Sequence, residues 1–136
     1  MVKRTRILLV DDAPEVLRIF GGKLTEAGFE VLYAKDGNEG RETARRIKFD
    51  LILLDIRMPV MDGMDTLKRL KSEEITKDIP VIMLTSGDLS REAEAALIND
   101  LGATAYIQKG APFDVLVASI NKALKPHKEE RIEPKI

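Results

Sequence analysis

Acidic residues follow two short apolar runs, and their type and spacing could bind a divalent cation. Asp11 and Asp12 follow the run at residues 7–10, and Asp55 follows the run at residues 51–54. Unbroken apolar runs of this length are typical of strands that are covered on both faces of a parallel sheet. If the two strands are neighbours, their three carboxylates converge at the carboxyl ends of the strands, where open α/β sheets bind ligands.

The chemistry expected of this cluster is phosphoryl transfer. Carboxylates a few ångströms apart raise one another's pKa unless a cation lies between them, and oxygen ligands without His or Cys favour Mg²⁺. Thr85 follows a third apolar run and Lys109 follows a fourth. The charges of the three carboxylates, one Mg²⁺ and Lys109 sum to about zero. A phosphoryl group on Asp55 would meet groups that stabilise its oxygens, and a carboxylate can form an aspartyl-phosphate.

The elements that must position these residues alternate between strand and helix. Strands are predicted at residues 7–10, 29–34, 51–54, 81–84 and 105–107, and helices at 14–27, 39–47, 64–70, 90–101 and 112–125. Right-handed crossovers then give an α/β fold, a doubly wound five-stranded parallel sheet with five helices. The strand order that joins the acidic residues is 2-1-3-4-5, the flavodoxin-like order.

Three glycines bear on the strength of two of the predicted helices. Gly21 and Gly22 interrupt the first helix at a cost of about 1–2 kcal/mol relative to alanine, so either the backbone is closely approached there or the helix is weak. The second helix has a thin apolar face made by Gly40, Ala44 and Ile47, so we expect it to cover the sheet poorly.

Composition restricts the class further. The chain has 136 residues, 33% charged and 44% hydrophobic, with no Cys, as expected of one globular domain without disulfides or thiol chemistry. No apolar run is long enough to span a membrane, so a cytoplasmic location is expected. The net charge of -1 favours neither nucleic acid nor an acidic membrane surface, and the cluster of Lys3, Arg4 and Arg6 reads as a solvated terminus. Pro126 is expected to end the last helix, which leaves 126–136 as a short charged tail after a domain at 1–125.

From about Arg6 to Leu124 the chain resembles the receiver domains of two-component response regulators. The ordered features that carry the resemblance are the acidic pair, the Asp55 strand with MPVMDG at residues 58–63, the hydroxyl of Thr85 and the ammonium of Lys109. The resemblance implies a role for each of seven residues. Asp55 is the phosphoacceptor, Asp12 and Asp55 ligate Mg²⁺ with the backbone carbonyl of Arg57, Asp11 acts through water, Thr85 and Lys109 contact the phosphoryl group, and Tyr106 is the switch aromatic.

Two positions depart from the family pattern. The family usually has a proline, joined by a cis bond, directly after the lysine, whereas Gly110 follows Lys109 here. Because a cis bond without proline costs about 3–4 kcal/mol, we expect a trans bond. This would aim Lys109 differently, but backbone angles open to glycine can partly restore the aim, so we expect Lys109 to keep its phosphate contact. Gly40 and Arg41 also replace a small and a large apolar residue, which agrees with the thin second helix.

The resemblance implies a phosphorylation-controlled signalling module and not a turnover enzyme. Its partners would be a histidine kinase or a histidine phosphotransfer protein, together with an unknown output protein. A degenerate receiver that binds proteins without phosphate is the alternative, which the missing proline leaves open. A phosphohydrolase of the haloacid dehalogenase type is disfavoured. That family has a second aspartate, the acid/base, two residues after the first, and this chain has Arg57 at that position.

Overall fold

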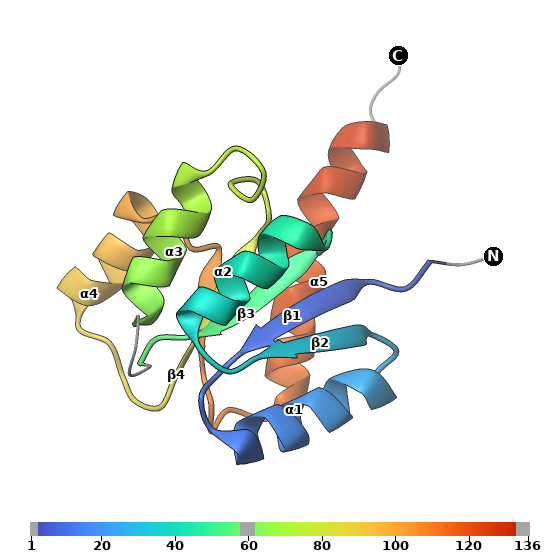
Figure 1. The fold of residues 1–136 in the computed structure, drawn as a ribbon, viewed down its shortest axis with the longest axis horizontal. Coiled ribbons are helices and arrows are strands. Elements are labelled where there is room, and N and C mark those ends of the chain that lie inside the picture. Colours follow the sequence, from blue (N-terminus) through green and yellow to red (C-terminus); the bar gives the residue numbers. More distant parts are fainter. Residues whose placement is uncertain (1–2, 58–61, 133–136) are drawn as a thin grey trace.

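The chain folds into a central parallel sheet with helices on both faces (Figure 1). The computed structural model describes the backbone of residues 3–57 and 62–132, and side chains as far as residue 124. In chain order the elements are β1 (Arg6–Val10), α1 (Pro14–Glu26), β2 (Glu30–Ala34), α2 (Gly37–Arg46), β3 (Leu51–Asp55), α3 (Gly63–Ser72), β4 (Val81–Thr85), α4 (Arg91–Ala95), the π-helix η1 (Ala96–Asp100), β5 (Ala105–Gln108) and α5 (Phe113–Ile132).

The strand order is β2-β1-β3-β4-β5, and all four pairings are parallel. The predicted fold class and strand order are therefore confirmed. β1 and β3 are neighbours in the register Val10↔Leu54, so the residues that follow Val10 and Leu54 leave the sheet at the same level. This register brings Asp11 beside Asp55.

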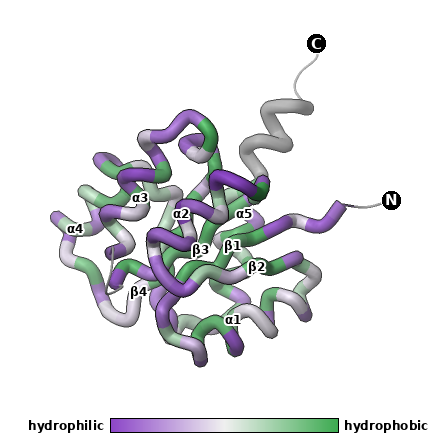
Figure 2. Tube along the Cα trace, viewed as in Figure 1, coloured by the Kyte–Doolittle hydropathy of each residue, from purple (hydrophilic) through white to green (hydrophobic). Residues whose placement is uncertain are grey.

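Successive side chains of each central strand point to opposite faces of the sheet and fill two separate cores. Leu8 and Val10 of β1 pack with residues of α2 and α3, whereas Ile7 and Leu9 pack with residues of α1 and α5. Figure 2 shows the hydrophobic residues gathered on the central strands and the hydrophilic ones on the outer turns of the helices. Burial on both faces explains why β1, β3 and β4 are continuous apolar runs.

Two glycines are sites of close approach. A Cβ at Gly21 would overlap the ring of Tyr33 on β2, whereas a Cβ at Gly22 would meet nothing within 4 Å. Close approach is therefore the reason for Gly21 but not for Gly22. A Cβ at Gly40 would lie 2.9 Å from Val10 Cγ2, so the glycine allows α2 to lie directly on β1.

Helix α2 does have little apolar surface, as predicted, and an ion pair fastens it to α3. Ala44 is buried, and the Arg41 guanidinium lies 2.5 Å from the Glu73 carboxylate at the end of α3. Arg41 stands where the family usually has a large apolar residue, and its ion pair with Glu73 links the two helices instead.

The helix predicted at residues 90–101 is present but widens in its second half, and the predicted end of the last helix is wrong. The helix expected at residues 90–101 is divided, because Leu101 N–H donates to the Ala96 carbonyl five residues back, and that bond widens the turn into the π-helix η1. Helix α5 does not stop at Pro126 but continues to Ile132. The residues after Pro126 include lysine, glutamate and arginine, whose high helix propensity favours continuation, against a cost of about 3 kcal/mol for an interior proline.

Among the helices that the structure describes, none combines the length and the apolar character needed to cross a membrane.

Candidate functional site

Three carboxylates meet at the carboxyl ends of β1 and β3, as the sequence predicted. Asp11, Asp12 and Asp55 each offer one oxygen, and these oxygens lie within 4.8 Å of one another. Asp11 and Asp55 are buried, and Asp12 is exposed. A site with two buried carboxylates and one open to solvent can hold a hard divalent cation and still admit a ligand.

Asp11 is the most enclosed of the three, and its orientation is fixed from two sides. Its side chain is fully buried, and Oδ1 accepts a hydrogen bond of 2.9 Å from Ala13 N–H at the start of α1. Oδ2 lies 2.8 Å from the Lys109 ammonium, which is its partner among the described residues. A buried oxygen stabilised mainly by charge is suited to a cation, directly or through water.

Lys109 bridges the two buried carboxylates. Its Nζ lies 2.8 Å from Asp11 Oδ2 and 3.2 Å from Asp55 Oδ1. The backbone between Lys109 and Gly110 is trans, and Gly110 does not adopt a positive φ. The N–H of Lys109 donates to the Thr85 carbonyl at 2.7 Å, which ties the end of β5 to the end of β4. The ammonium therefore reaches the site through a trans bond, without the conformations reserved for glycine.

The buried carboxylates carry more negative charge than the single ammonium of Lys109 balances. Burial raises the pKa of Asp55, and the neighbouring Asp11 raises it further, while Lys109 and the Arg57 N–H oppose the shift only in part. Burial alone would lower the pKa of Lys109, but Asp11 and Asp55 outweigh it and the pKa is raised. One ammonium for two buried carboxylates leaves a net negative charge, which favours the uptake of a cation.

Arg57 lies at the mouth of the site. Its side chain is exposed, and its backbone N–H lies 3.4 Å from Asp55 Oδ1. Residues 58–61 of the predicted MPVMDG motif lie outside the described residues, whereas Asp62 and Gly63 begin α3. Asp62 accepts a hydrogen bond of 2.9 Å from Asp65 N–H, and a Cβ at Gly63 would overlap the Asp55 carbonyl. Glycine at this position thus lets α3 begin directly against the end of β3.

Thr85 is buried beside the site, but its hydroxyl is bonded to its own loop. Oγ1 donates to the Gly87 carbonyl at 2.9 Å and accepts from Gly87 N–H at 3.2 Å.

Tyr106 is half-buried and packs against the core that lies under α2 and α3. Its pKa is raised by burial and by the negative charges of Glu94 and Asp88.

One feature beside the site was missed by sequence reasoning. The side chain of Gln108 donates a hydrogen bond to Asp88, so the loop after β4 is fastened to the end of β5. The pair is separated by 20 residues, and nothing in the local sequence signals that two such common side chains will meet.

A doubly wound parallel sheet with three carboxylates, a lysine and a buried hydroxyl at its switch point defines a class of phosphoryl-accepting regulators. The chain belongs to the response regulator receiver domain family, whose model matches residues 7–121. It is thus a receiver domain of two-component response regulators. The predicted family is confirmed, and neither the comparisons nor the described residues favour the phosphate-independent alternative.

Three similar proteins represent the comparisons. The chain is 40% identical over 111 residues to the "DNA-binding dual master transcriptional regulator RpaA" of Synechocystis, covering 81% of this chain and 44% of that protein. The Vibrio cholerae chemotaxis protein CheY4 matches with a TM-score of 0.83 and 30% identity over 90% of this chain and 100% of that chain. The Thermotoga maritima response regulator TrrA, in complex with Mg(2+)-BeF, matches with a TM-score of 0.78 and 30% identity over 88% of this chain and 99% of that chain. The chain thus spans less than half the length of RpaA.

Proposed function

We propose that Asp55 accepts a phosphoryl group in a Mg²⁺-dependent reaction and that this modification controls partner binding. The observation that carries the proposal is the convergence of Asp11, Asp12 and Asp55 around one lysine at the carboxyl edge of the sheet. The burial of Asp11 and Asp55 and the repulsion between them are costs that a structural role would not require.

The donor set fits Mg²⁺. Asp12, Asp55 and the Arg57 carbonyl would hold the ion, and Asp11 would act through water. All are oxygen ligands; the chain has no Cys, and no His joins this group among the described residues. Bound Mg²⁺ supplies positive charge to phosphoryl oxygens during transfer. TrrA, which is similar to this chain over 99% of its own length, is known in complex with Mg(2+)-BeF.

In the proposed reaction an Asp55 carboxylate oxygen attacks the phosphorus of a phosphohistidine, and the phosphorus–nitrogen bond of the donor breaks. The histidine nitrogen departs with the electron pair of that bond, and an acyl phosphate remains on Asp55. Asp55 must be ionised to attack, and Lys109 favours that state because its ammonium opposes the raised pKa of Asp55. Lys109 and Thr85 then contact the new phosphoryl oxygens.

The Thr85 hydroxyl has to leave Gly87 before it can contact a phosphoryl group. We propose that this exchange loosens the loop after β4 and leaves a space that Tyr106 occupies. Shifting a two-state equilibrium from 1:99 to 99:1 requires about 5.5 kcal/mol, which is more than one charge-assisted hydrogen bond supplies. We therefore expect a partial shift that partner binding completes, on the face formed by α4, β5 and α5.

The wider context follows from the family. The proposed phosphodonor is a histidine kinase or a histidine phosphotransfer protein, and the output protein is unknown. We propose residues 1–125 as the receiver domain and 126–136 as a short charged tail, although helix α5 crosses this boundary. The domain acts in the cytoplasm, turns over no separate substrate and itself binds neither nucleic acid nor membrane.

Phosphotransfer from a small donor tests the assignment. Acetyl phosphate with Mg²⁺ should give acid-labile labelling of the parent protein, while EDTA or the Asp55→Asn substitution should abolish it. Asp12→Ala should weaken Mg²⁺ binding. Undiminished labelling of Asp55→Asn, or labelling of the parent that is equal in EDTA, would refute the proposal.

A further inference from the structure

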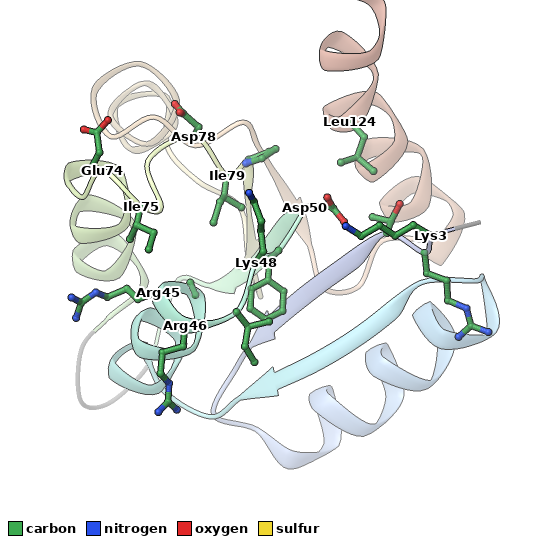
Figure 3. Close-up of a pocket in the computed structure, with 16 residues that line it drawn as sticks. Lys3, Arg45, Arg46, Lys48, Asp50, Glu74, Ile75, Asp78, Ile79 and Leu124 are labelled. Atoms are coloured by element: carbon green, nitrogen blue, oxygen red, sulfur yellow. The ribbon is translucent and has the colours of Figure 1, made fainter. Parts of the chain in front are cut away.

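The amino edge of the sheet, opposite the aspartate cluster, has a hollow of about 940 Å³ (Figure 3). Its lining includes Thr5, Asp50 and Pro80, which directly precede β1, β3 and β4. The aspartates follow the other ends of β1 and β3. A strand of five residues is about 16 Å long, so the hollow and the phosphorylation site lie on opposite edges of the sheet.

The hollow has an apolar floor. Ile79 packs against the core under α2 and α3, and Leu124 packs against the core under α1 and α5, so the two cores come to the surface together here. Ile75 stands on one side with 64% of its surface exposed, more than any other large hydrophobic residue among those described. A single exposed aliphatic residue is ordinary, but one beside a hollow with further apolar residues marks a surface suited to binding.

The rim is basic. Five basic residues line the hollow against three acidic ones, Asp50, Glu74 and Asp78. The basic residues are Lys3, Arg4, Arg45, Arg46 and Lys48.

Two of the three acidic side chains already have partners. Asp50 Oδ2 accepts a hydrogen bond of 2.8 Å from Arg6 N–H, and Glu74 Oε1 lies 3.3 Å from the Lys77 ammonium. Arg46 and Lys48 are exposed, and neither forms an ion pair within the part of the chain that the structure describes. Asp50 keeps its charge, because a backbone N–H does not neutralise it, and Arg45 is paired with Glu42 and Glu73. Four basic residues, Lys3, Arg4, Arg46 and Lys48, still outnumber Asp50 and Asp78, so the rim is positive toward a ligand.

The shape favours a polypeptide. A second hollow of about 630 Å³ adjoins the first, and the two share Arg45, Arg46, Glu74 and Ile75. Together they form a trough whose lining extends from Leu124 of α5, past the end of α2, to the segment after α3. The second hollow adds Glu42 and Glu73, and both are paired with Arg45. A compact anion would fill one part of such a trough, whereas a peptide segment can follow its length.

We propose that this trough docks an acidic segment of another protein, with aliphatic side chains of that segment against Ile75 and Ile79. Acidic residues of the segment face Arg46 and Lys48. Because the trough is at the far edge of the sheet from Asp55, docking is independent of phosphorylation, unlike binding to the face of α4, β5 and α5. The trough would hold a partner near the domain in both states of the phosphorylation site.

A random-peptide phage library selected on the full chain tests the proposal. The selected peptides should be enriched in Asp and Glu together with Ile, Leu or Val. Titration of one such peptide, followed by backbone NMR, should shift residues 44–50 and 74–80 and leave those around Asp55 unchanged. Raising NaCl from about 0.05 M to about 0.5 M should weaken binding, because rim charges are screened.

Paired variants test the two parts of the surface separately. Ile75→Ser and Arg46→Glu should each weaken peptide binding about tenfold, as removal of a central anchor or reversal of a rim charge does. The matched substitutions Ile19→Ser and Arg18→Glu on the exposed side of α1 should leave affinity within about twofold of the parent. Beryllium fluoride with Mg²⁺ should leave affinity unchanged, and Ile75→Ser should still be labelled at Asp55.

Four results would overturn the proposal. These are selected peptides without acidic enrichment, NMR shifts confined to other surfaces, equal losses in the α1 controls, and a change of affinity with beryllium fluoride. Displacement of the peptide by inorganic phosphate at equal concentration would assign the trough to a small anion instead. Shifts at residues 44–50 and 74–80 that grow with protein concentration alone would assign it to a second copy of the chain.

Discussion

Replacing Lys109 by methionine should destabilise the protein in a way that Mg²⁺ reverses. The substitution keeps most of the side-chain volume but leaves Asp11 and Asp55 buried without a cation. Each ion pair, at 2.8 and 3.2 Å, has a gross attraction of about 5–6 kcal/mol at an effective dielectric constant of about 20. Desolvation of the three charges and repulsion between the carboxylates offset most of this attraction.

The net loss lies between the limits for exposed and buried pairs. Exposed pairs contribute about 0–1 kcal/mol, and breaking a buried pair costs about 3–5 kcal/mol. The Lys109 side chain is 20% exposed, and Asp11 is fully buried. We expect a loss of about 2 kcal/mol in the free energy of unfolding, which shifts the urea midpoint down by about 1 M.

Urea unfolding at pH 7, in EDTA and in Mg²⁺, measures the effect. Mg²⁺ stabilises the parent as well, so the deficit shrinks only by the difference in affinity. Without the lysine the cluster binds Mg²⁺ more tightly, and about thirtyfold tighter binding offsets about 2 kcal/mol, so the deficit should nearly disappear. Lys71→Met is the matched control. Its ammonium is half-buried but donates to the carbonyls of Lys77 and Ile79, so the loss in that variant should be the same in EDTA and Mg²⁺. An equal deficit for Lys109→Met in both buffers would refute the electrostatic reasoning.

Other substitutions separate the remaining parts of the structure. In EDTA, Asp55→Asn should raise stability at pH 7. The pKa of the Asp55 carboxyl is raised above 3.8 in the folded protein, so the folded state binds the proton more tightly than the unfolded state. The contribution of Asp55 to stability therefore falls as the pH rises from 3.8 to the raised pKa, and it is lowest at higher pH. Thermal unfolding of this variant should show a higher midpoint than the parent. Gly40→Ala should cost about 1–3 kcal/mol by forcing the helix away from Val10, while Gly22→Ala, in open space, should stabilise by up to about 1 kcal/mol; reversed signs in urea unfolding would refute the packing account. Arg57→Ala should shorten the lifetime of the phosphorylated state about two- to tenfold, because the guanidinium holds phosphate oxygens or obstructs the attacking water; an unchanged rate of phosphate release would place the side chain away from the site.

The sequence predicted the sheet and its acidic edge because both depend on local signals. Continuous apolar runs identify strands that are covered on both faces, and a carboxylate directly after such a run has to lie at the strand end. The prediction that Asp11, Asp12 and Asp55 converge needed only the order of the strands. The trans bond after Lys109 was likewise expected from the energy of the peptide bond.

Features that depend on tertiary contact could not be predicted in this way. The close approach at Gly21 depends on where Tyr33 lies, and the hydrogen bond from Gln108 to Asp88 joins residues that are 20 apart. The change from α-helix to π-helix at Ala96 leaves no trace in the apolar pattern. The predicted end of α5 was wrong because the prediction gave Pro126 more weight than the helix propensity of the residues that follow it.

The central claim is that Asp55 carries the phosphoryl group, and chemical trapping tests it most directly. An acyl phosphate on an aspartate is reduced by borohydride to homoserine, which remains at the modified position through proteolysis and peptide sequencing by mass spectrometry. After treatment with acetyl phosphate and Mg²⁺, we predict homoserine at position 55 and unmodified aspartate at positions 11 and 12. Homoserine at position 11 or 12, or unmodified Asp55 in a protein that carries acid-labile phosphate, would contradict the assignment.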